Sequence, residues 1–450
     1  MKQSEKIYID TFNSDWQKSK KSFAAQTDYI KNSTAKYHGR VVRTLAIPKM
    51  FDESECSEFK NIAEKTHTIL TKVIKNYLQN ESFRKYFFFD ENLQKLILAP
   101  AGYDCLLPVA RVDIFFNEDT HDFKFCEINT DGTSAMNEDR ELNISVKLTD
   151  AYAKLEKKYN IKSFELFDSF VKDFMAVYET YENRVSNPNV AIVDFLDRGT
   201  INEFEQFRLA FERAGINAEV CDIKELKYKD GKLFSPSNMK IDAIYRRAVT
   251  HDIIENIDLV PDFISAIENC AVCLVGAIRT QVAHSKILFK VLSQKEGLDF
   301  LTDDELDFID KHIPKTYMLE KDNPLIDLSE ICRKKNKWII KPVDSYGSYG
   351  VHAGVECETD GEWKKYIDEC MDKGYIVQEF VTPYVTKNTD FSEDNKYCDY
   401  SNLTGLFLYG GHFRGIYSRV SKTEIISTQY SEITLASMAV SEKDEANVLN

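Results

Sequence analysis

Two apolar segments on either side of residue 120 carry polar side chains at spacings that could bind a metal ion. The segments VARVDIFF (109–116) and FKFCEIN (123–129) alternate in character and are rich in Val, Ile and Phe, which is typical of strands. The polar segment EDTHD between them has the length of an ordinary hairpin loop. In a hairpin folded about residue 120, four polar side chains share one face: Arg111 opposite Asn129, and Asp113 opposite Glu127.

The expected opposition of Asp113 and Glu127 needs a physical reason. Two carboxylates about 4 Å apart repel by roughly 4 kcal/mol at an effective dielectric of 20. A bound cation, a shared proton or exposure on a wet edge would relieve this repulsion. With the amide of Asn129, the pair forms a hard-oxygen set that suits Mg²⁺, and Arg111 beside it suggests an anion near the metal. The alternative is an exposed polar face that Arg111 balances.

A second candidate segment, KWIIKPVDSYGSYG (337–350), reads as a strand followed by a glycine-rich loop. Glycines let backbone N–H groups approach phosphate oxygens closely, and a strand lysine just before the loop can supply countercharge. The spacing does not match the P-loop pattern, and a glycine-rich hairpin turn is the alternative. The candidate phosphate contacts here are Lys341, Gly347, Ser348, Tyr349 and Gly350.

Other polar residues lie where ligands commonly bind. Lys286 is predicted in the first turn of a helix, where the helix dipole gains nothing from a cation, so an anion nearby is expected. Thr133 and Ser134 follow the hairpin in a small polar loop that could contact a substrate, or could be an ordinary turn before a capped helix. Arg246 and Arg247 close a predicted strand, where one could hold a carboxylate; a surface salt bridge is the alternative.

The elements that would position these residues indicate a mixed α/β protein. Strand–helix–strand alternation over residues 189–280 predicts a largely parallel sheet, and the absence of GxGxxG argues against a dinucleotide site. Helical spacing from about residue 52 to 79 predicts a scaffold helix that Asp52 caps. Segment 403–421 reads as a hairpin turned at Gly410–Gly411, and the polar segment 384–400 as a mobile loop.

Composition narrows the functional classes. A chain of 450 residues suggests two or three domains. The net charge of −15 argues against general binding to nucleic acids or membrane surfaces, and leaves a small anionic ligand in a locally basic cleft possible. The N-terminus lacks an apolar signal segment, and the ten cysteines include one CxxC, Cys270 and Cys273, inside an apolar run that favours a buried strand. We therefore expect a cytoplasmic protein with reduced thiols.

Together these motifs resemble the synthetase domain of the glutathionylspermidine synthase family, a circularly permuted ATP-grasp ligase. The resemblance rests on R-x-D followed by E-x-N at Arg111, Asp113, Glu127 and Asn129, on Ser285–Lys286, and on Lys341–Pro342 before the glycine loop. It covers roughly residues 40–435. The run after Asn129, the SYGSYG loop and the Arg419–Ser421 segment depart from the family pattern, and no amidase domain is present in this sequence.

The resemblance implies an ATP-grasp-like, circularly permuted α/β (α+β mixed) fold with an N-terminal helical segment and an inserted parallel α/β unit. The implied domains are 1–90 (helical scaffold), 91–185 (first ATP-grasp part), 186–283 (pre-ATP-grasp unit), 284–435 (nucleotide-binding part) and 436–450 (tail). It also implies Mg²⁺ on Asp113, Glu127 and Asn129, ATP phosphates on Lys286 and Lys341, adenine at Gln378, Glu379, Phe380 and Val381, charge stabilisation by Arg111 and Arg419, and substrate contacts at Thr133, Ser134 and Arg247.

The implied activity is ATP- and Mg²⁺-dependent condensation of a small carboxylate with an amine through an acyl phosphate. The alternative is a degenerate ATP-grasp protein that binds nucleotide or peptide without turnover. The sequence names neither substrate, and it gives no oligomeric state.

Overall fold

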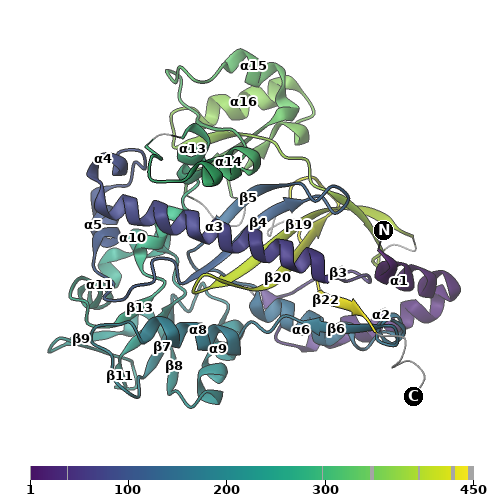
Figure 1. The fold of residues 1–450 in the computed structure, drawn as a ribbon, viewed down its shortest axis with the longest axis horizontal. Helices are drawn as coiled ribbons and strands as arrows, with labels where there is room; N and C mark the ends of the chain where they lie inside the picture. Colours follow the sequence, from purple (N-terminus) through teal and green to yellow (C-terminus); the bar gives the residue numbers. More distant parts are fainter. Residues whose placement is uncertain are drawn as a thin grey trace.

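A computed structural model describes residues 2–37, 39–295, 297–344, 349–393, 396–426 and 431–443. The chain forms a mixed α/β structure with several sheets (Figure 1). Among the described residues, no helix has both the length and the apolar character needed to cross a membrane.

The central sheet is antiparallel, and it carries the predicted metal-site hairpin. Its strand order is β21-β20-β19-β4-β5, and β18 pairs with β19. The predicted hairpin at Gly410–Gly411 is confirmed, since β19 and β20 meet there. The strands are β4 (Val109–Phe116), β5 (Phe123–Asn129), β18 (Val385–Asn388), β19 (Cys398–Tyr409), β20 (His412–Ser421) and β21 (Ile433–Leu435).

One face of this sheet is covered by the long helix α3 (Glu53–Gln79), which crosses β19 and β20 (Figure 1). The helix begins as predicted at Asp52, whose carboxylate accepts from the backbone N–H of Glu55 at 2.9 Å, while Glu55 accepts in return from the N–H of Asp52. This capping box satisfies two otherwise unpaired donors. Val112 and Ile114 of β4 are fully buried in the same core as α3, so the alternate residues of β4 face the other side.

A four-stranded parallel sheet, β13-β12-β7-β8, forms the predicted α/β unit. The strands β7 and β13 are buried along their whole length, as is typical of a parallel sheet, whereas β8 at the sheet edge is only partly buried. Cys273 lies buried in β13, as its apolar run predicted. The unit contains β7 (Val190–Asp194), α9 (Ile201–Arg213), β8 (Ala218–Asp222), β12 (Ala243–Arg246), α10 (Thr250–Glu255), α11 (Pro261–Glu268) and β13 (Cys273–Val275), with a side sheet of β9 (Lys227–Lys229), β10 (Lys232–Phe234) and β11 (Lys240–Ile241).

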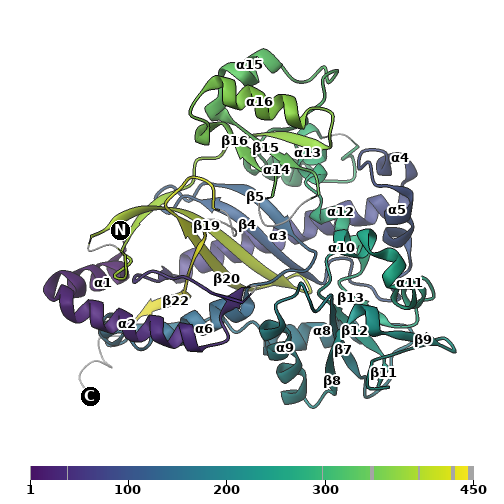
Figure 2. The same ribbon diagram turned by 180° about the vertical axis from the view of Figure 1, so that it is seen from behind.

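A separate lobe at the top of Figure 2 holds an antiparallel sheet of order β14-β17-β15-β16. Two helices pack on it and bury Trp363 in a core of the lobe's own, distinct from the main core. The lobe contains β14 (Thr316–Met318), α15 (Leu328–Arg333), β15 (Trp338–Pro342), β16 (His352–Ala353), α16 (Asp360–Cys370) and β17 (Tyr375–Glu379).

The two ends of the chain meet in a third region. β22 (Ser437–Glu442) pairs in parallel with β3 (Lys49–Phe51) and antiparallel with β6 (Tyr159–Ser163). The remaining elements are β1 (Lys36–Tyr37), β2 (Arg40–Val41), α1 (Gln3–Ser14), α2 (Trp16–Asn32), α4 (Glu81–Arg84), α5 (Glu91–Leu98), α6 (Met136–Val146), α7 (Asp150–Leu155), α8 (Asp168–Tyr178), α12 (Gln281–His284), α13 (Ile287–Gln294) and α14 (Asp303–His312).

One element expectation is wrong. Segment 384–400 was expected as a loop, but Val385–Asn388 forms β18 and pairs with β19 from Val385↔Ser401 to Asn388↔Cys398. Its polar composition hid the strand because polar side chains are tolerated at a sheet edge. Asn388 is buried as well, and its side-chain amide accepts from the backbone N–H and donates to the carbonyl of Ile47.

Candidate active site

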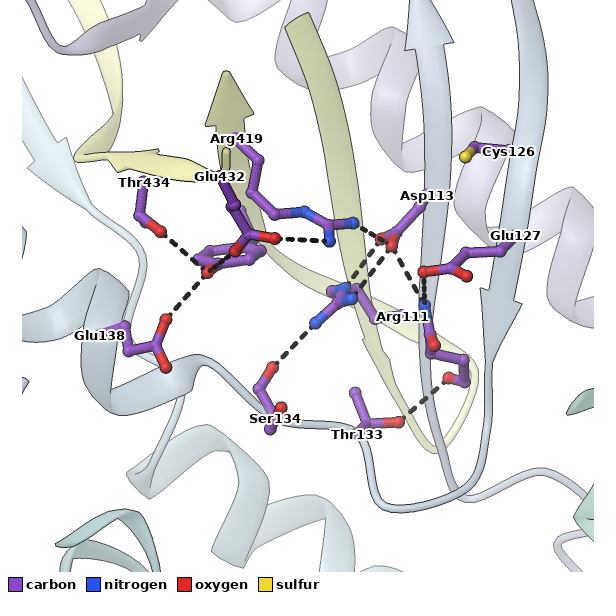
Figure 3. A network of polar contacts seen from close by, with 12 residues as sticks. Arg111, Asp113, Cys126, Glu127, Thr133, Ser134, Glu138, Arg419, Glu432 and Thr434 are labelled. Carbon is purple, nitrogen blue, oxygen red and sulfur yellow. Dashed lines mark hydrogen bonds and ion pairs between the residues drawn. The ribbon is translucent and has the colours of Figure 1, made fainter. Parts of the chain in front are cut away.

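The hairpin register predicted from the sequence is confirmed. β4 and β5 pair antiparallel, with Arg111 opposite Asn129 and Asp113 opposite Glu127. The four side chains lie on the face of the central sheet that is turned away from α3 and reach one another through hydrogen bonds (Figure 3). The alternating sequence of the two strands was therefore enough to predict that these four side chains lie together.

A β-bulge at Cys126 was not predicted. The register shifts between Asp113 and Ile114, which leaves Cys126 as the extra residue of β5. Simple alternation would put Phe123 and Phe125 on the same face as Glu127. Because of the bulge, Phe125 pairs with Ile114 and both phenylalanines join the main apolar core, although Phe125 also reaches the cavity wall. Glu127 stays on the polar face opposite Asp113.

Asp113 is completely buried and is held by two arginines (Figure 3). Arg111 donates from Nε and Nη2 to its two oxygens at 2.7 and 3.0 Å, and Arg419 of β20 donates to Oδ2. The amide of Asn129 adds a fourth donor at 3.1 Å. Guanidinium groups therefore compensate the Asp113–Glu127 repulsion: Arg111, as the alternative interpretation had it, and also Arg419 from β20. The exposed polar face of that alternative is wrong for Asp113, which is buried.

The charges nearby set the protonation of both carboxylates. Burial raises the pKa of Asp113, and the two guanidiniums oppose that effect. Burial would also raise the pKa of Glu127, but the cations of Lys286, Arg419 and Arg111 outweigh it and lower the pKa to about 2. Glu127 is thus a fixed negative charge at neutral pH.

A glycine on the neighbouring strand makes room for this network. Gly405 of β19 lies opposite Asp113. A Cβ atom at this position would lie 2.8 Å from Asp113 Oδ1 and 2.9 Å from Arg111 Cδ, which is too close for either contact. The site therefore needs a residue without a side chain here.

The two predicted phosphate lysines face the hairpin from other parts of the chain. Lys341 of β15 donates to Gln378 Oε1 at 2.8 Å and to the carbonyl of the bulged Cys126 at 3.4 Å. Lys286 occupies the N-cap position of α13, one residue before the first turn in which the sequence placed it, and its backbone N–H donates to the carbonyl of Val343. Burial lowers the pKa of Lys286, as does the charge of Lys341, whereas Glu127 opposes this shift.

A cavity of about 860 Å³ joins these groups. Most of the predicted site residues line it, and Ile339, Val351 and Leu403 add apolar surface at the same cavity. Asp113 and Gly350 are not part of the lining, and Gly347 and Ser348 lie outside the described residues. The predicted residues that line the cavity are Arg111, Glu127, Asn129, Thr133, Ser134, Arg247, Lys286, Lys341, Tyr349, Gln378, Glu379, Phe380, Val381 and Arg419.

At the segment predicted to receive adenine, two backbone donors are already used. The N–H of Glu379 bonds the carbonyl of Lys315 at 2.8 Å, and the N–H of Phe380 bonds that of Lys337 at 2.7 Å. The Gln378 side chain bonds Thr316 and Lys341. A base bound here would therefore use other main-chain groups of this segment.

The loop after β5 is held in place by hydrogen bonds from Arg111 and Arg247. Arg111 Nη1 donates to the carbonyl of Ser134 at 3.0 Å, and Arg247 donates to the carbonyl of Thr133. Arg247 also pairs with Glu203 at 2.8 Å and is only 4% exposed, so the alternative of a surface salt bridge is wrong for it. Arg246 is buried as well, in an ion pair with Asp131.

Sequence reasoning missed a polar cluster next to the arginines. The hydroxyl of Tyr417 lies 2.9 Å from Glu138 Oε2, 3.3 Å from Glu432 Oε1 and 3.0 Å from Thr434 Oγ1 (Figure 3). Tyr417 could have been found, since it stands two residues before Arg419 on the same strand face. Glu432 and Thr434 could not, because the C-terminal segment carried no readable pattern.

The hairpin offers oxygen donors that fit a magnesium ion in part. Glu127 and Asn129 line the cavity, whereas both oxygens of Asp113 already bind guanidinium groups. No cluster of three or more His, Cys, Asp or Glu side chains suited to a metal occurs in the described part of the chain. Carboxylate and amide oxygens with room for phosphate oxygens are what Mg²⁺ usually accepts.

Comparisons with known proteins identify a solved structure with a similar fold. No protein-family model and no curated protein sequence matches the chain. A glutathione synthetase-like effector from Globodera pallida, solved in its apo form, is similar in structure, with a TM-score of 0.62 and 12% identity over 93% of this chain and 96% of that one. The chain therefore shares the fold of this effector.

A putative gamma-glutamylcysteine synthetase from Methylobacillus flagellatus KT matches with a TM-score of 0.42 and 13% identity over 80% of this chain and 84% of that one. Neither of the two structures is a glutathionylspermidine synthase. The sequence resemblance is thus supported at the level of a ligase-like fold.

Proposed function

We propose that this protein is an ATP- and Mg²⁺-dependent ligase that joins a carboxylate to an amine through an acyl phosphate, on a circularly permuted ATP-grasp fold. The observation that carries the proposal is the single cavity onto which Glu127, Asn129, two arginines and two lysines converge from distant parts of the chain. Four cations beside the fixed negative charge of Glu127 suit a polyphosphate with a metal ion.

In this proposal each group has a role that follows from its charge. Lys286 and Lys341 hold the ATP phosphates while the substrate carboxylate attacks the γ-phosphate, giving acyl phosphate and ADP. Arg111 and Arg419 stabilise the charge that develops at the reacting oxygens. Glu127 and Asn129 would hold the magnesium ion, joined by Asp113 when the metal replaces one of its arginine contacts; the ion would neutralise phosphate charge.

The remaining contacts orient the substrates. Thr133 and Ser134 lie beside the arginines and would contact the carboxylate substrate, with Arg247 holding their loop in place. Adenine would lie along 378–381 against apolar residues of the cavity, and the loop containing Tyr349 and Gly350 would cover the phosphates. Phosphoryl transfer depends mainly on such positioning.

One observation favours a second candidate, a nucleotide- or peptide-binding protein without turnover. The ion pairs of Asp113 with Arg111 and Arg419 are complete without a metal. A degenerate site that had lost its metal would keep such a network, because removing one partner of a buried ion pair is costly.

Trapping with hydroxylamine separates the two candidates without knowledge of the amine. Purified protein is mixed with Mg·ATP, hydroxylamine and a panel of carboxylates that includes γ-glutamylcysteine, glutathione and single amino acids. The ligase should release ADP and form a hydroxamate with at least one carboxylate, and Glu127→Ala should abolish both. Asp122→Ala, an exposed acid in the loop of the same hairpin, is the control and should keep activity. ATP binding without any hydroxamate would favour the binding protein.

A further inference from the structure

The Tyr417 cluster has features that the proposed phosphate and metal contacts do not use. Glu138, in the first turn of α6, lines the cavity and is 8% exposed, and Glu432 lines the same cavity. Both carboxylates lie within hydrogen-bonding distance of the Tyr417 hydroxyl. That hydroxyl has one proton and can donate to only one of the two carboxylates at a time, and within the described part of the chain Glu138 accepts a side-chain hydrogen bond from Tyr417 alone, so Glu138 has capacity for a further donor.

The cluster stands next to the groups assigned to the acyl phosphate. The guanidinium carbons of Arg111 and Arg419 lie 5.3 and 5.6 Å from the centre of the Tyr417 ring. Arg419 Nη1 is also 3.4 Å from Glu432 Oε2. The cavity wall therefore changes from basic to acidic across one tyrosine.

From this arrangement we propose that Glu138 and Glu432 receive the amine substrate as an ammonium ion and that Glu138 is the catalytic residue that accepts its proton. The inference rests on the ligase function proposed above. It specifies the amine as one that is cationic at neutral pH, because two carboxylates that share one phenol favour a positive charge between them.

The reaction balances with these groups. The ammonium loses one proton to Glu138, and the freed nitrogen lone pair forms the new bond to the acyl carbon. The bond between that carbon and the phosphate oxygen breaks, and its electron pair leaves with inorganic phosphate. The second nitrogen proton goes to the departing phosphate, which leaves a neutral amide.

The surroundings of Glu138 support this role. Burial, together with the charges of Glu432 and Glu203, raises its pKa to about 8, which Tyr417 and Arg111 oppose. A bound ammonium ion would favour the ionised form of Glu138 and bring its pKa down toward neutral pH. A proton acceptor is most effective when its pKa lies near the working pH.

The test compares two nucleophiles on the same acyl phosphate. Hydroxylamine is neutral at pH 7, and the one nitrogen proton that it loses can go to the departing phosphate. Glycine and spermidine arrive as ammonium ions and must lose a further proton before they attack. Each is supplied with Mg·ATP and whichever carboxylate of the panel gives a hydroxamate with wild type. Glu138→Gln keeps an acceptor for the Tyr417 hydroxyl, so it removes basicity with little change in shape.

We expect Glu138→Gln to slow amide formation by about 10²–10⁴-fold and to leave hydroxamate formation within a few-fold of wild type. Glu141→Gln is the matched control, since Glu141 lies on the same helix, is buried, and bonds Tyr29 outside the cavity. Equal loss of both products would make Glu138 structural, and no loss of amide would also overturn the proposal.

Glu432→Gln provides a second measurement should Glu138→Gln fail to fold. It should raise KM for the amine at least about tenfold while hydroxamate formation persists. An unchanged KM would overturn the assigned amine site. If wild type yields no hydroxamate with any carboxylate, the ligase function itself is wrong and the amine site is rejected with it; hydroxamate formation without an effect of these variants rejects the amine site alone.

Discussion

At the scale of single residues, Glu138 gives a pH-dependent contribution to stability. Its pKa in the folded chain is about 8, above the ordinary value for a glutamate, so the folded state binds this proton more tightly than the unfolded state. The free energy of unfolding contributed by this group therefore falls as the pH rises between the two pKa values.

Glu138→Gln removes this titration. Its stability relative to wild type should increase from about pH 5 to about pH 8, by at most about 1.4 kcal/mol per pH unit. Urea unfolding at several pH values measures the difference, with Glu141→Gln as the control. A difference that stays constant across this range would contradict the prediction.

At the scale of elements, the hairpin shows what a sequence can and cannot predict. Alternation and loop length predicted β4, β5 and the pairing of Asp113 with Glu127, because these depend on local spacing. The strand β19, which pairs with β4, and the residue Arg419, which bonds Asp113, lie about 300 residues further along the chain. Local spacing does not determine which distant strand pairs with the hairpin. The bulge also escaped prediction, since CEI reads as continued alternation.

The close approach of β19 to β4 predicts that Gly405→Ala damages the site. The new methyl group would press on Asp113 and Arg111, so we expect a loss of about 1–3 kcal/mol in unfolding free energy and loss of Mg·ATP turnover. Gly361→Ala is the control, because it lies in α16 where the nearest atom is 3.8 Å away and alanine favours a helix. Equal stability of the two variants would contradict the assigned packing.

At the scale of the whole molecule, the cavity is built from units with separate apolar cores. The lobe that carries Lys341 buries Trp363 in its own cluster, while the hairpin belongs to the main core. The contact from Lys341 to the carbonyl of Cys126 spans the two. A ligand held by both units should therefore stabilise each of them.

We expect Mg·ATP to stabilise the protein by about 2.7 kcal/mol at roughly 100 times its Kd, and to slow hydrogen exchange both in β15 and in β5. Lys341→Met should remove most of this effect. Lys364→Met, an exposed residue of α16 that pairs with Asp368, should not. Protection confined to the lobe would show that the nucleotide does not reach the hairpin.

The extra residue in β5 has a consequence for how this site can vary. Cys126 separates two stretches of β5 in which odd-numbered residues lie on opposite faces of the sheet. Before it, the aromatic side chains belong to the core, and after it, Glu127 lies at the cavity. Replacing its thiol does not change which residues of β5 face the core and which face the cavity. Deleting the residue would force one of the two stretches to turn over, so position 126 matters as a spacer, whatever side chain occupies it.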